Sequence, residues 1–241
     1  MSKQNRDQGR AERAAAIRAE QARKERNRRV ALIVGIVVIL GAIVAGGVWY
    51  TSGTGTTPTP ATKVTATAGS GSVIAGPSSA PTKVVIYEDF QCPYCRQLED
   101  STRDFLRQNA AAGKVQVEYH PIDLLQSVYG ERGMNAFAAV LAHSTPQAAL
   151  TLHDLLYENQ PYESASGSVS QSQILGFVKK AGGDNAAVES ALGAKDADFF
   201  AAAAEVMSSK NITSTPTVFI NGKPVTGGVP QIVDAIEKAV D

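Results

Sequence analysis

The first hydrophobic feature of the chain is a long apolar run. Residues 30–50 contain no Asp, Glu, Lys or Arg over 21 positions. A helix of this length spans a hydrocarbon core of about 30 Å. Basic residues crowd its start, between Lys24 and Arg29, and Trp49 and Tyr50 lie at its end, as interfacial aromatics do. We therefore expect a single transmembrane helix at 30–50, with the N-terminus in the cytoplasm and the rest of the chain outside.

Two other interpretations of this run were weighed. A cleaved signal peptide usually has an apolar region of roughly 7–15 residues, shorter than this one. Its small-x-small cleavage pattern is clear only at 66–68, too far beyond the apolar run. A buried helix of a soluble protein would make the flanking charge asymmetry a coincidence. A retained anchor explains the pattern best.

Polar segments flank the predicted anchor. Residues 1–29 are rich in Arg, Ala and Glu and lack an apolar face, which predicts a solvated cytoplasmic segment. Residues 51–82 are rich in Thr, Ser, Gly, Pro and Ala. Such a composition cannot bury a core and is typical of a flexible tether. A folded domain is therefore expected at 83–241.

The domain begins and ends with β and α patterns. The apolar run 84–87 predicts a strand, 96–112 a helix, and the alternation at 115–119 a second strand. Near the C-terminus, Asn221-Gly222 separates two short runs of strand formers, which is a strong hairpin signal. A last helix is expected at 230–240.

The part between these patterns is helical. Residues 124–212 show four apolar stripes at helical spacing and no strand pattern. The stripes are Met134, Phe137, Val140 and Leu141; Leu152, Leu155 and Leu156; Ile174, Phe177 and Val178; Phe199, Phe200, Ala203 and Met207. The expected fold is an α/β domain interrupted by a helical insertion.

The charge distribution narrows the classes of partner. The net charge is zero, but residues 1–29 carry ten Lys or Arg against four Asp or Glu, so the remainder is acidic. Without a basic patch in the domain, nucleic acid is not an expected partner. Two cysteines in 241 residues do not make a disulfide scaffold.

Both cysteines lie in one motif, Cys92-Pro93-Tyr94-Cys95, between the first predicted strand and helix. A zinc site would need two further ligands, and the three histidines show no ligand spacing, so no metal is expected. A structural disulfide would close a very small loop and stabilise little. A dithiol that cycles between reduced and oxidised forms explains the pair best. No cofactor is expected beyond the redox-active disulfide.

The position of the motif favours different roles for the two sulfurs. At a helix N-terminus, free N–H groups and the helix dipole stabilise a thiolate, which lowers the pKa of Cys92. Pro93 suits the first turn, where its missing N–H costs nothing. Cys92 is therefore expected to be the exposed attacking sulfur, and Cys95, one turn further on and more enclosed, the resolving sulfur.

A second motif makes a family resemblance specific. A strand, a Cys-x-x-Cys helix and, much later, Thr215-Pro216 before a hairpin resemble the thioredoxin superfamily. The resemblance implies that Pro216 is cis and lies against the cysteines, and that Thr215 binds substrate through its backbone. Glutaredoxins share a Cys-Pro-Tyr-Cys motif but lack a long helical insertion. Over 83–241 the chain therefore looks like the DsbA-like extracytoplasmic thiol oxidoreductases.

Two departures from the family pattern concern redox tuning. Many relatives carry a buried acid six positions before the first cysteine, thought to assist proton transfer at the resolving thiol, where this chain has Ile86. Glu88 and Asp89 are candidate substitutes, although the simpler interpretation is that they are solvated loop acids. Pro93 and Tyr94, between the cysteines, are the expected redox-tuning residues. Tyr94 replaces the His of the most oxidising members, so a weaker oxidant than DsbA is expected.

The resemblance implies a membrane-tethered oxidase of cysteines in exported proteins. Its electrons would pass to a membrane partner of the DsbB or quinone-reductase kind. Two alternatives stay open: a tethered disulfide reductase or isomerase with the same residues, and a non-enzymatic extracytoplasmic assembly domain with a vestigial cysteine pair.

Overall fold

The computed structural model describes residues 64–241. The predicted cytoplasmic segment, the membrane helix at 30–50 and residues 51–63 of the predicted tether lie outside these residues. Within residues 64–241, none of the helices combines the length and apolar character that a membrane crossing requires.

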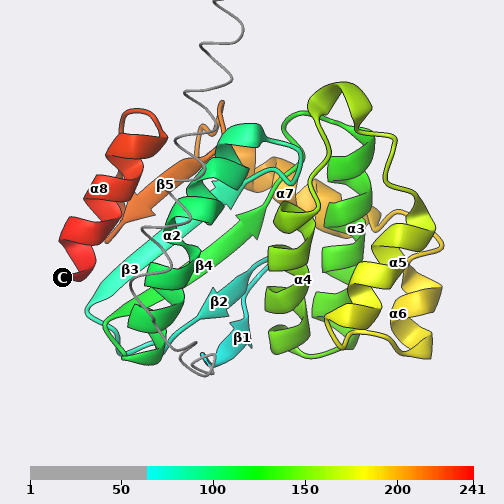
Figure 1. Ribbon diagram of the computed structural model, residues 1–241, viewed down its shortest axis with the longest axis horizontal. Coiled ribbons are helices and arrows are strands. Elements are labelled where there is room, and N and C mark those ends of the chain that lie inside the picture. Colours follow the sequence, from blue (N-terminus) through cyan, green and yellow to red (C-terminus); the bar gives the residue numbers. More distant parts are fainter. Residues whose placement is uncertain (1–63) are drawn as a thin grey trace, which may run out of the picture. The chain divides into compact units, whose positions relative to one another are not determined.

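The described chain contains a six-stranded mixed sheet and a set of helices (Figure 1). The strands are β1 (Ala66–Ala68), β2 (Val73–Ala75), β3 (Thr82–Glu88), β4 (Val115–Pro121), β5 (Thr217–Ile220) and β6 (Lys223–Pro224). The helices are α2 (Pro93–Ala111), α3 (Val128–His143), α4 (Pro146–Glu158), α5 (Gln171–Lys180), α6 (Ala186–Ala191), α7 (Ala197–Ser209) and α8 (Val229–Val240), with a 3₁₀ turn η1 at Glu163–Ala165.

Strand β3 lies inside the sheet, whose order is β1-β2-β4-β3-β5-β6. It runs parallel to β4, with Ile86 opposite Tyr119, and antiparallel to β5, with Tyr87 opposite Thr217. The parallel pair is joined by α2, as a parallel connection requires a crossover. This register brings the end of β3, where the cysteine motif follows, next to the start of β5, where Thr215-Pro216 precedes.

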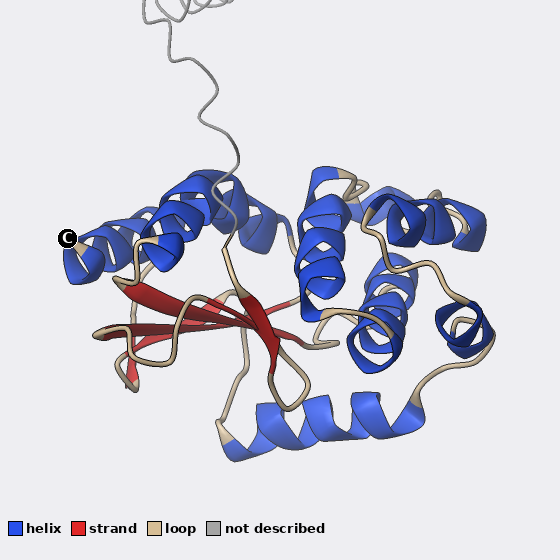
Figure 2. Cartoon of the chain, turned by 90° about the horizontal axis from the view of Figure 1, so that it is seen from below, coloured by secondary structure: helices blue, strands red, loops and turns tan. Residues whose placement is uncertain are grey.

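Helices cover both faces of the sheet (Figure 2). Helices α2 and α8 lie on one face, where the alternation of β3 buries Val84 and Ile86. Helix α7 covers the other face, and its residues pack against a smaller cluster around Tyr87 and Ile122. Helices α3 to α6 form a block beside the sheet, with α4 contacting β1 and β2. The core is therefore continuous from the sheet into the helical block.

Most of the predicted pattern is confirmed. Helices α3 to α7 run from 128 to 209, inside the predicted insertion 124–212. The Asn-Gly hairpin joins β5 to β6, with φ of 50° at Asn221 and 78° at Gly222, the left-handed values that this tight turn needs. Helix α2 begins at Pro93, three residues before its predicted start, because the proline is well suited to the first turn.

The predicted tether at 51–82 is wrong from residue 66 onward. Residues 66–75 form the antiparallel pair β1–β2, and β2 adds to the edge of β4 with Val73 opposite Tyr119. Val73 is fully buried, and the Ser72 hydroxyl donates to a carboxylate oxygen of Glu118 at 2.7 Å. The strands are three residues long, so their apolar signal was lost among the surrounding Gly, Ser and Thr.

Candidate active site

The cysteine motif lies where β3 ends and α2 begins. Cys92 is the N-cap of α2, with extended backbone angles (φ −70°, ψ 120°), and Pro93 occupies the first turn. The Cys92 amide donates to the carbonyl of Asp89 at 2.9 Å, which closes the turn between strand and helix. The Cys92 sulfur therefore lies at the end of the helix where unpaired N–H groups point.

The two thiols, which are free in the structure, have very different pKa values. A hydrogen bond from the Cys95 side chain lowers the pKa of Cys92 to about 6, against the opposing effect of burial. Hydrogen bonding with Thr215 and with the backbone of Cys95 and Tyr94 lowers it further. Burial raises the pKa of Cys95 well above the ordinary value, and the neighbouring Cys92 and the charge of Glu88 add to this. At neutral pH, Cys92 is the thiolate and Cys95 the thiol.

The expected exposure of Cys92 needs correction. Cys92 is only 4% exposed and Cys95 1%, so both are buried. Cys92 is the more exposed of the two cysteines, as expected. Its sulfur is nevertheless buried, because the segment around Thr215 covers it. Tyr94, in contrast, is 62% exposed beside it.

The segment before β5 forms the other wall of the site. The Thr215-Pro216 peptide bond is cis, as the family resemblance implied. The Cys92 sulfur lies 3.4 Å from the Thr215 carbonyl oxygen, which accepts a hydrogen bond from the thiol when Cys92 is protonated. The structure therefore brings Cys92 into contact with Thr215, which lies 123 positions later in the sequence and directly precedes the cis-proline Pro216.

A loop after α4 holds the active-site turn, and sequence reasoning missed it. The Gln160 amide donates to the carbonyls of Phe90 and Cys92, at 2.8 and 3.0 Å. The side-chain amide of Gln91 donates to the Pro161 carbonyl of the same loop at 2.9 Å. Gln160 carries no motif, and its role depends on the packing of the helical block, which a sequence pattern does not give.

Asp89 is a buried structural acid rather than a solvated one. One of its carboxylate oxygens accepts a hydrogen bond from the backbone N–H of Gln91 at 2.8 Å. The other accepts one from the backbone N–H of Leu125 at 2.9 Å. Burial raises its pKa, which these amides partly offset. Asp89 thus ties the turn before Cys92 to the loop before α3.

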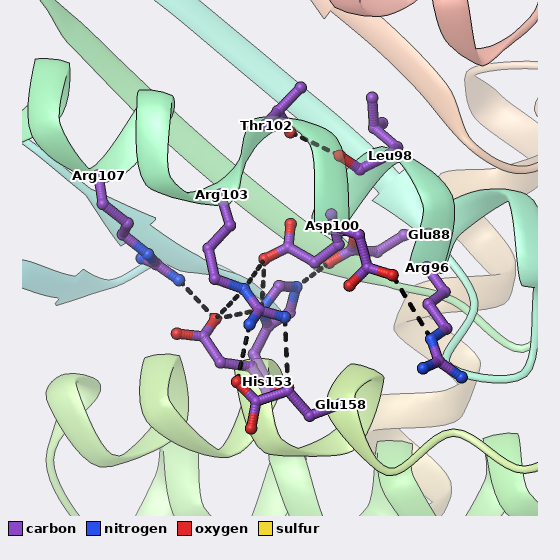
Figure 3. A network of polar contacts seen from close by, with 11 residues as sticks. Glu88, Arg96, Leu98, Asp100, Thr102, Arg103, Arg107, His153 and Glu158 are labelled. Atoms are coloured by element: carbon purple, nitrogen blue, oxygen red, sulfur yellow. Dashed lines mark hydrogen bonds and ion pairs between the residues drawn. The ribbon is translucent and has the colours of Figure 1, made fainter. Parts of the chain in front are cut away.

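Glu88, the last residue of β3, is also buried, at 2% exposure, so the expectation of a solvated acid is wrong here too. Its Oε1 lies 2.6 Å from Nε2 of His153, a fully buried residue of α4 (Figure 3). The other ring nitrogen, Nδ1, lies 3.1 Å from Oδ1 of Asp154 and 3.7 Å from Oε1 of Glu99. His153 was considered in the sequence only as a zinc ligand, and its partner became visible only in the fold.

Two arginines of α2 complete this network (Figure 3). Arg103 Nε contacts Glu99 at 3.1 Å, and its Nη1 contacts Glu158 at 2.8 Å. Arg107 contacts Asp154 at 2.7 Å. Glu88, Glu99 and His153 place ligand-type atoms within 4.8 Å of one another. These atoms bond to one another and to Arg103, so hydrogen bonding accounts for the cluster without a metal.

His120, near the end of β4, has a packing role. Its ring stacks on Tyr87 at a centroid distance of 5.0 Å, and its Nε2 lies 2.9 Å from Oε1 of Glu118.

The lowered pKa of Cys92 predicts a specific alkylation profile. In the reduced protein, carbamidomethylation of Cys92 by iodoacetamide should rise with a midpoint near pH 6, while Cys95 stays unmodified. In Cys95→Ala, which removes the largest contribution, the midpoint should move up toward that of an ordinary thiol. Peptide mass spectrometry of the alkylated protein gives both values. Equal labelling of both cysteines, or a wild-type midpoint near 9, would contradict the assignment.

The same shift has a consequence for stability. The folded pKa of Cys92 lies below that of the unfolded thiol, so its ionisation stabilises the reduced fold. This contribution is complete above the unfolded value and is lost as the pH falls through about 6. The oxidised protein has no Cys92 thiol to titrate. The free energy of unfolding of the reduced form should therefore fall relative to that of the oxidised form as the pH is lowered from the unfolded thiol pKa through about 6.

The geometry defines a thioredoxin-fold domain with a dithiol at the N-terminus of a helix and a cis-proline facing it. A protein-family model described as Thioredoxin matches residues 68–241, and the chain belongs to that family. The match begins at the last residue of β1, so it covers nearly all of the folded domain that the structure describes.

Solved structures share the fold, including the helical insertion. MdbA, a thiol-disulfide oxidoreductase from Corynebacterium diphtheriae, is 22% identical, with a TM-score of 0.61 over 73% of this chain and 93% of that one. DsbA from Mycobacterium tuberculosis is also 22% identical, with a TM-score of 0.56 over 70% of this chain and 99% of that one. A protein named DsbG, from the same organism, gives 0.58 over 69% and 86%.

Two curated proteins also match. Na(+)/H(+) antiporter NhaA 3 of Salinispora tropica is 28% identical over 174 residues, and NhaA 1 of Salinispora arenicola is 25% identical over 173 residues. The match covers 69% of this chain but only 24% of each antiporter. The chain thus spans about a quarter of these relatives, and the similarity does not assign ion transport to it.

Proposed function

We propose that the protein is a thiol–disulfide oxidoreductase that works outside the cytoplasm and oxidises cysteines of exported proteins. The observation that carries the proposal is the unequal dithiol: the pKa of Cys92 is lowered to about 6, that of Cys95 is raised, and Thr215 faces Cys92 across the site. A structural pair would not need this difference in acidity.

The unequal pair suits disulfide donation. A substrate thiolate attacks Cys92 of the oxidised pair, and Cys95 leaves and takes up a proton. A second substrate thiolate then attacks the substrate sulfur of the mixed disulfide and releases Cys92. Cys92 leaves readily because it is a stable thiolate. Two electrons pass from the substrate to the cysteine pair. This exchange needs no cofactor besides the pair itself.

The direction of exchange follows from how strongly the thiolate is stabilised. Stabilising the reduced form makes the disulfide more oxidising. A Cys92 pKa of about 6 is lowered from the ordinary thiol value, but by much less than the value of about 3.5 for DsbA. This supports an oxidase weaker than DsbA, with Pro93 and Tyr94 as the tuning residues. Glu88 is the proposed proton-transfer group; Asp89, whose two oxygens hold backbone amides, is less suited to it.

Apolar side chains around the site support a polypeptide substrate. Large apolar residues that are exposed in the described part of the chain include Tyr94, Leu125, Val128 and Tyr162. Tyr94 lies between the two cysteines, the Leu125 backbone amide donates to Asp89, and Tyr162 follows Pro161, whose carbonyl accepts from Gln91. Thr215 would pair with the substrate backbone, and these side chains would contact its apolar residues.

Location and partners form part of the same proposal. The segment 30–50 would anchor the protein as a single span, with the N-terminus in the cytoplasm and the catalytic domain outside. Reoxidation would come from a membrane protein of the DsbB or quinone-reductase kind. The similarity to a part of two proteins named as antiporters supports a membrane setting.

A refolding assay tests the direction of exchange. The oxidised protein should restore activity to reduced, unfolded ribonuclease, with loss of its own disulfide in stoichiometric amount. It should reduce insulin only slowly in the presence of dithiothreitol. Fast insulin reduction without ribonuclease oxidation would favour the reductase alternative. Inactivity in both assays would favour the assembly domain.

A further inference from the structure

A histidine that no motif identifies is bonded to the acid next to the resolving cysteine. His153 of α4 is completely buried, and its Nε2 lies 2.6 Å from Oε1 of Glu88. We propose that His153 is a positioning residue that acts through Glu88: its contact holds the Glu88 carboxylate in the orientation needed for proton exchange with Cys95. This inference rests on the proposed exchange activity and adds a residue to it.

The fold places Glu88 close enough to Cys95 for its charge to raise the pKa of that thiol. Glu88 ends β3, four residues before Cys92. Cys95 and Glu99 lie four residues apart on α2, hence on the same face of the helix, and both are buried. Glu99 approaches Nδ1 of His153 at 3.7 Å. Cys95, Glu99 and Glu88 therefore surround one buried region, with His153 entering it from α4.

The charges of the region favour a positively charged ring. Burial by itself lowers the pKa of His153, but the carboxylates of Glu88 and Glu99 outweigh it and raise the pKa to about 10. The titratable and charged groups around the His153–Glu88 pair are Asp89 from the β3–α2 turn; Cys95, Glu99, Arg103 and Arg107 from α2; Asp154, Tyr157 and Glu158 from α4; Tyr119 from β4; and Cys92. Near neutral pH the imidazolium is thus the counter-charge of Glu88 in a region without water access.

The proton exchange can be written with all atoms balanced. When Cys92 is held in a mixed disulfide, the Cys95 thiol gives its proton to the Glu88 carboxylate. The Cys95 thiolate then attacks Cys92, the sulfur–sulfur bond between them forms, and the bond from Cys92 to the partner breaks. The partner leaves as a thiolate, and the proton held by Glu88 then passes to the leaving thiolate or to solvent, which restores the carboxylate. In the opposite direction, Cys95 leaves and Glu88 returns the proton.

The contact with His153 matters for this step because a proton passes only between groups held at hydrogen-bonding distance. Nε2 of His153 fixes Oε1 of Glu88 at 2.6 Å in the buried region. Without the imidazolium, the Glu88 side chain loses the partner that holds it in place.

Reaction with Ellman's disulfide separates the two cysteines. The Cys92 thiolate releases one thionitrobenzoate as it forms a mixed disulfide, and Cys95 releases the second as it closes the Cys92–Cys95 bond. In His153→Gln, which keeps an amide donor but no charge, we expect the first phase to be unchanged. The second phase should be at least about tenfold slower at pH 7, because proton transfer by a positioned group contributes about 100-fold or more to a rate. A purely structural defect would slow both phases.

Two further variants test that His153 acts through Glu88. Glu88→Gln should slow the second phase, and the double variant Glu88→Gln/His153→Gln should be no slower than Glu88→Gln alone. His120→Gln is the matched control, since His120 also contacts a glutamate oxygen, at 2.9 Å, but on the side of the sheet covered by α7. It should leave both phases unchanged. Additive effects of the two substitutions would overturn the proposal.

The outcomes separate this inference from the proposed function. If the wild type releases no second thionitrobenzoate, the exchange activity itself is wrong. If it does, and His153→Gln behaves like wild type, only the role of His153 is wrong. A measurement on the wild type does not depend on the folding of a variant: nitrogen NMR should show His153 protonated on both ring nitrogens at pH 8, and a neutral ring there would overturn the proposal.

Discussion

Replacement of Cys95 by alanine should convert the protein into a trap for its partners. In Cys95→Ala, a mixed disulfide at Cys92 has no internal thiol to resolve it, so covalent complexes should accumulate. Cys92→Ala should form none, and its exchange rate should fall to that of the buffer, because the remaining thiol is buried and protonated at neutral pH. These are the largest functional effects that the site predicts.

The measurement is non-reducing electrophoresis of the tagged, full-length variants from cells whose thiols were blocked with acid. Complexes should appear with Cys95→Ala, disappear on reduction and be absent from the Cys92→Ala/Cys95→Ala double variant. Mass spectrometry should identify exported, cysteine-containing proteins in them. Complexes formed through Cys95 in Cys92→Ala would reverse the assigned roles. The absence of any complex would favour the assembly alternative.

The predictable part of the fold is local in sequence. The β3 run, the hairpin at Asn221-Gly222 and the helical stripes each follow from a short pattern of residues, and all three are confirmed. The pair β1–β2 was missed because its stability comes from pairing with β4, not from its own apolar content. Short strands depend on the neighbour that completes them, which a linear pattern does not show.

The same distinction applies to the site. The cysteine motif and Thr215-Pro216 were recognisable because the family pattern requires those residue types in that order. The burial of Glu88 was not, because a glutamate next to a turn is usually solvated. Its burial is made possible by His153, which lies 65 positions away on another helix. A buried acid is thus predictable only together with the charge that faces it.

Phe90→Ala should cause the largest loss of stability among single substitutions near the site. Phe90 is 1% exposed and joins the active-site turn to the helical block, with its ring 5.4 Å from Tyr157 and 6.1 Å from Phe137 between centroids. It also borders the ring of His153, at 6.0 Å. Truncation leaves a cavity that both parts of the core share, so the free energy of unfolding should fall by about 3–5 kcal/mol.

Urea unfolding of the oxidised protein measures this loss as a lower midpoint at unchanged slope. Phe105→Ala is the control: Phe105 lies on α2 at the edge of the core and is only partly buried, so its truncation should cost clearly less. The pKa of Cys92 should stay near 6 in folded Phe90→Ala, because the groups that lower it belong to α2 and Thr215 and do not include Phe90. A loss below about 1 kcal/mol would mean that the helical block is held to the sheet without this side chain, and that the turn before Cys92 is positioned by the hydrogen bonds of Gln160 and Asp89 alone.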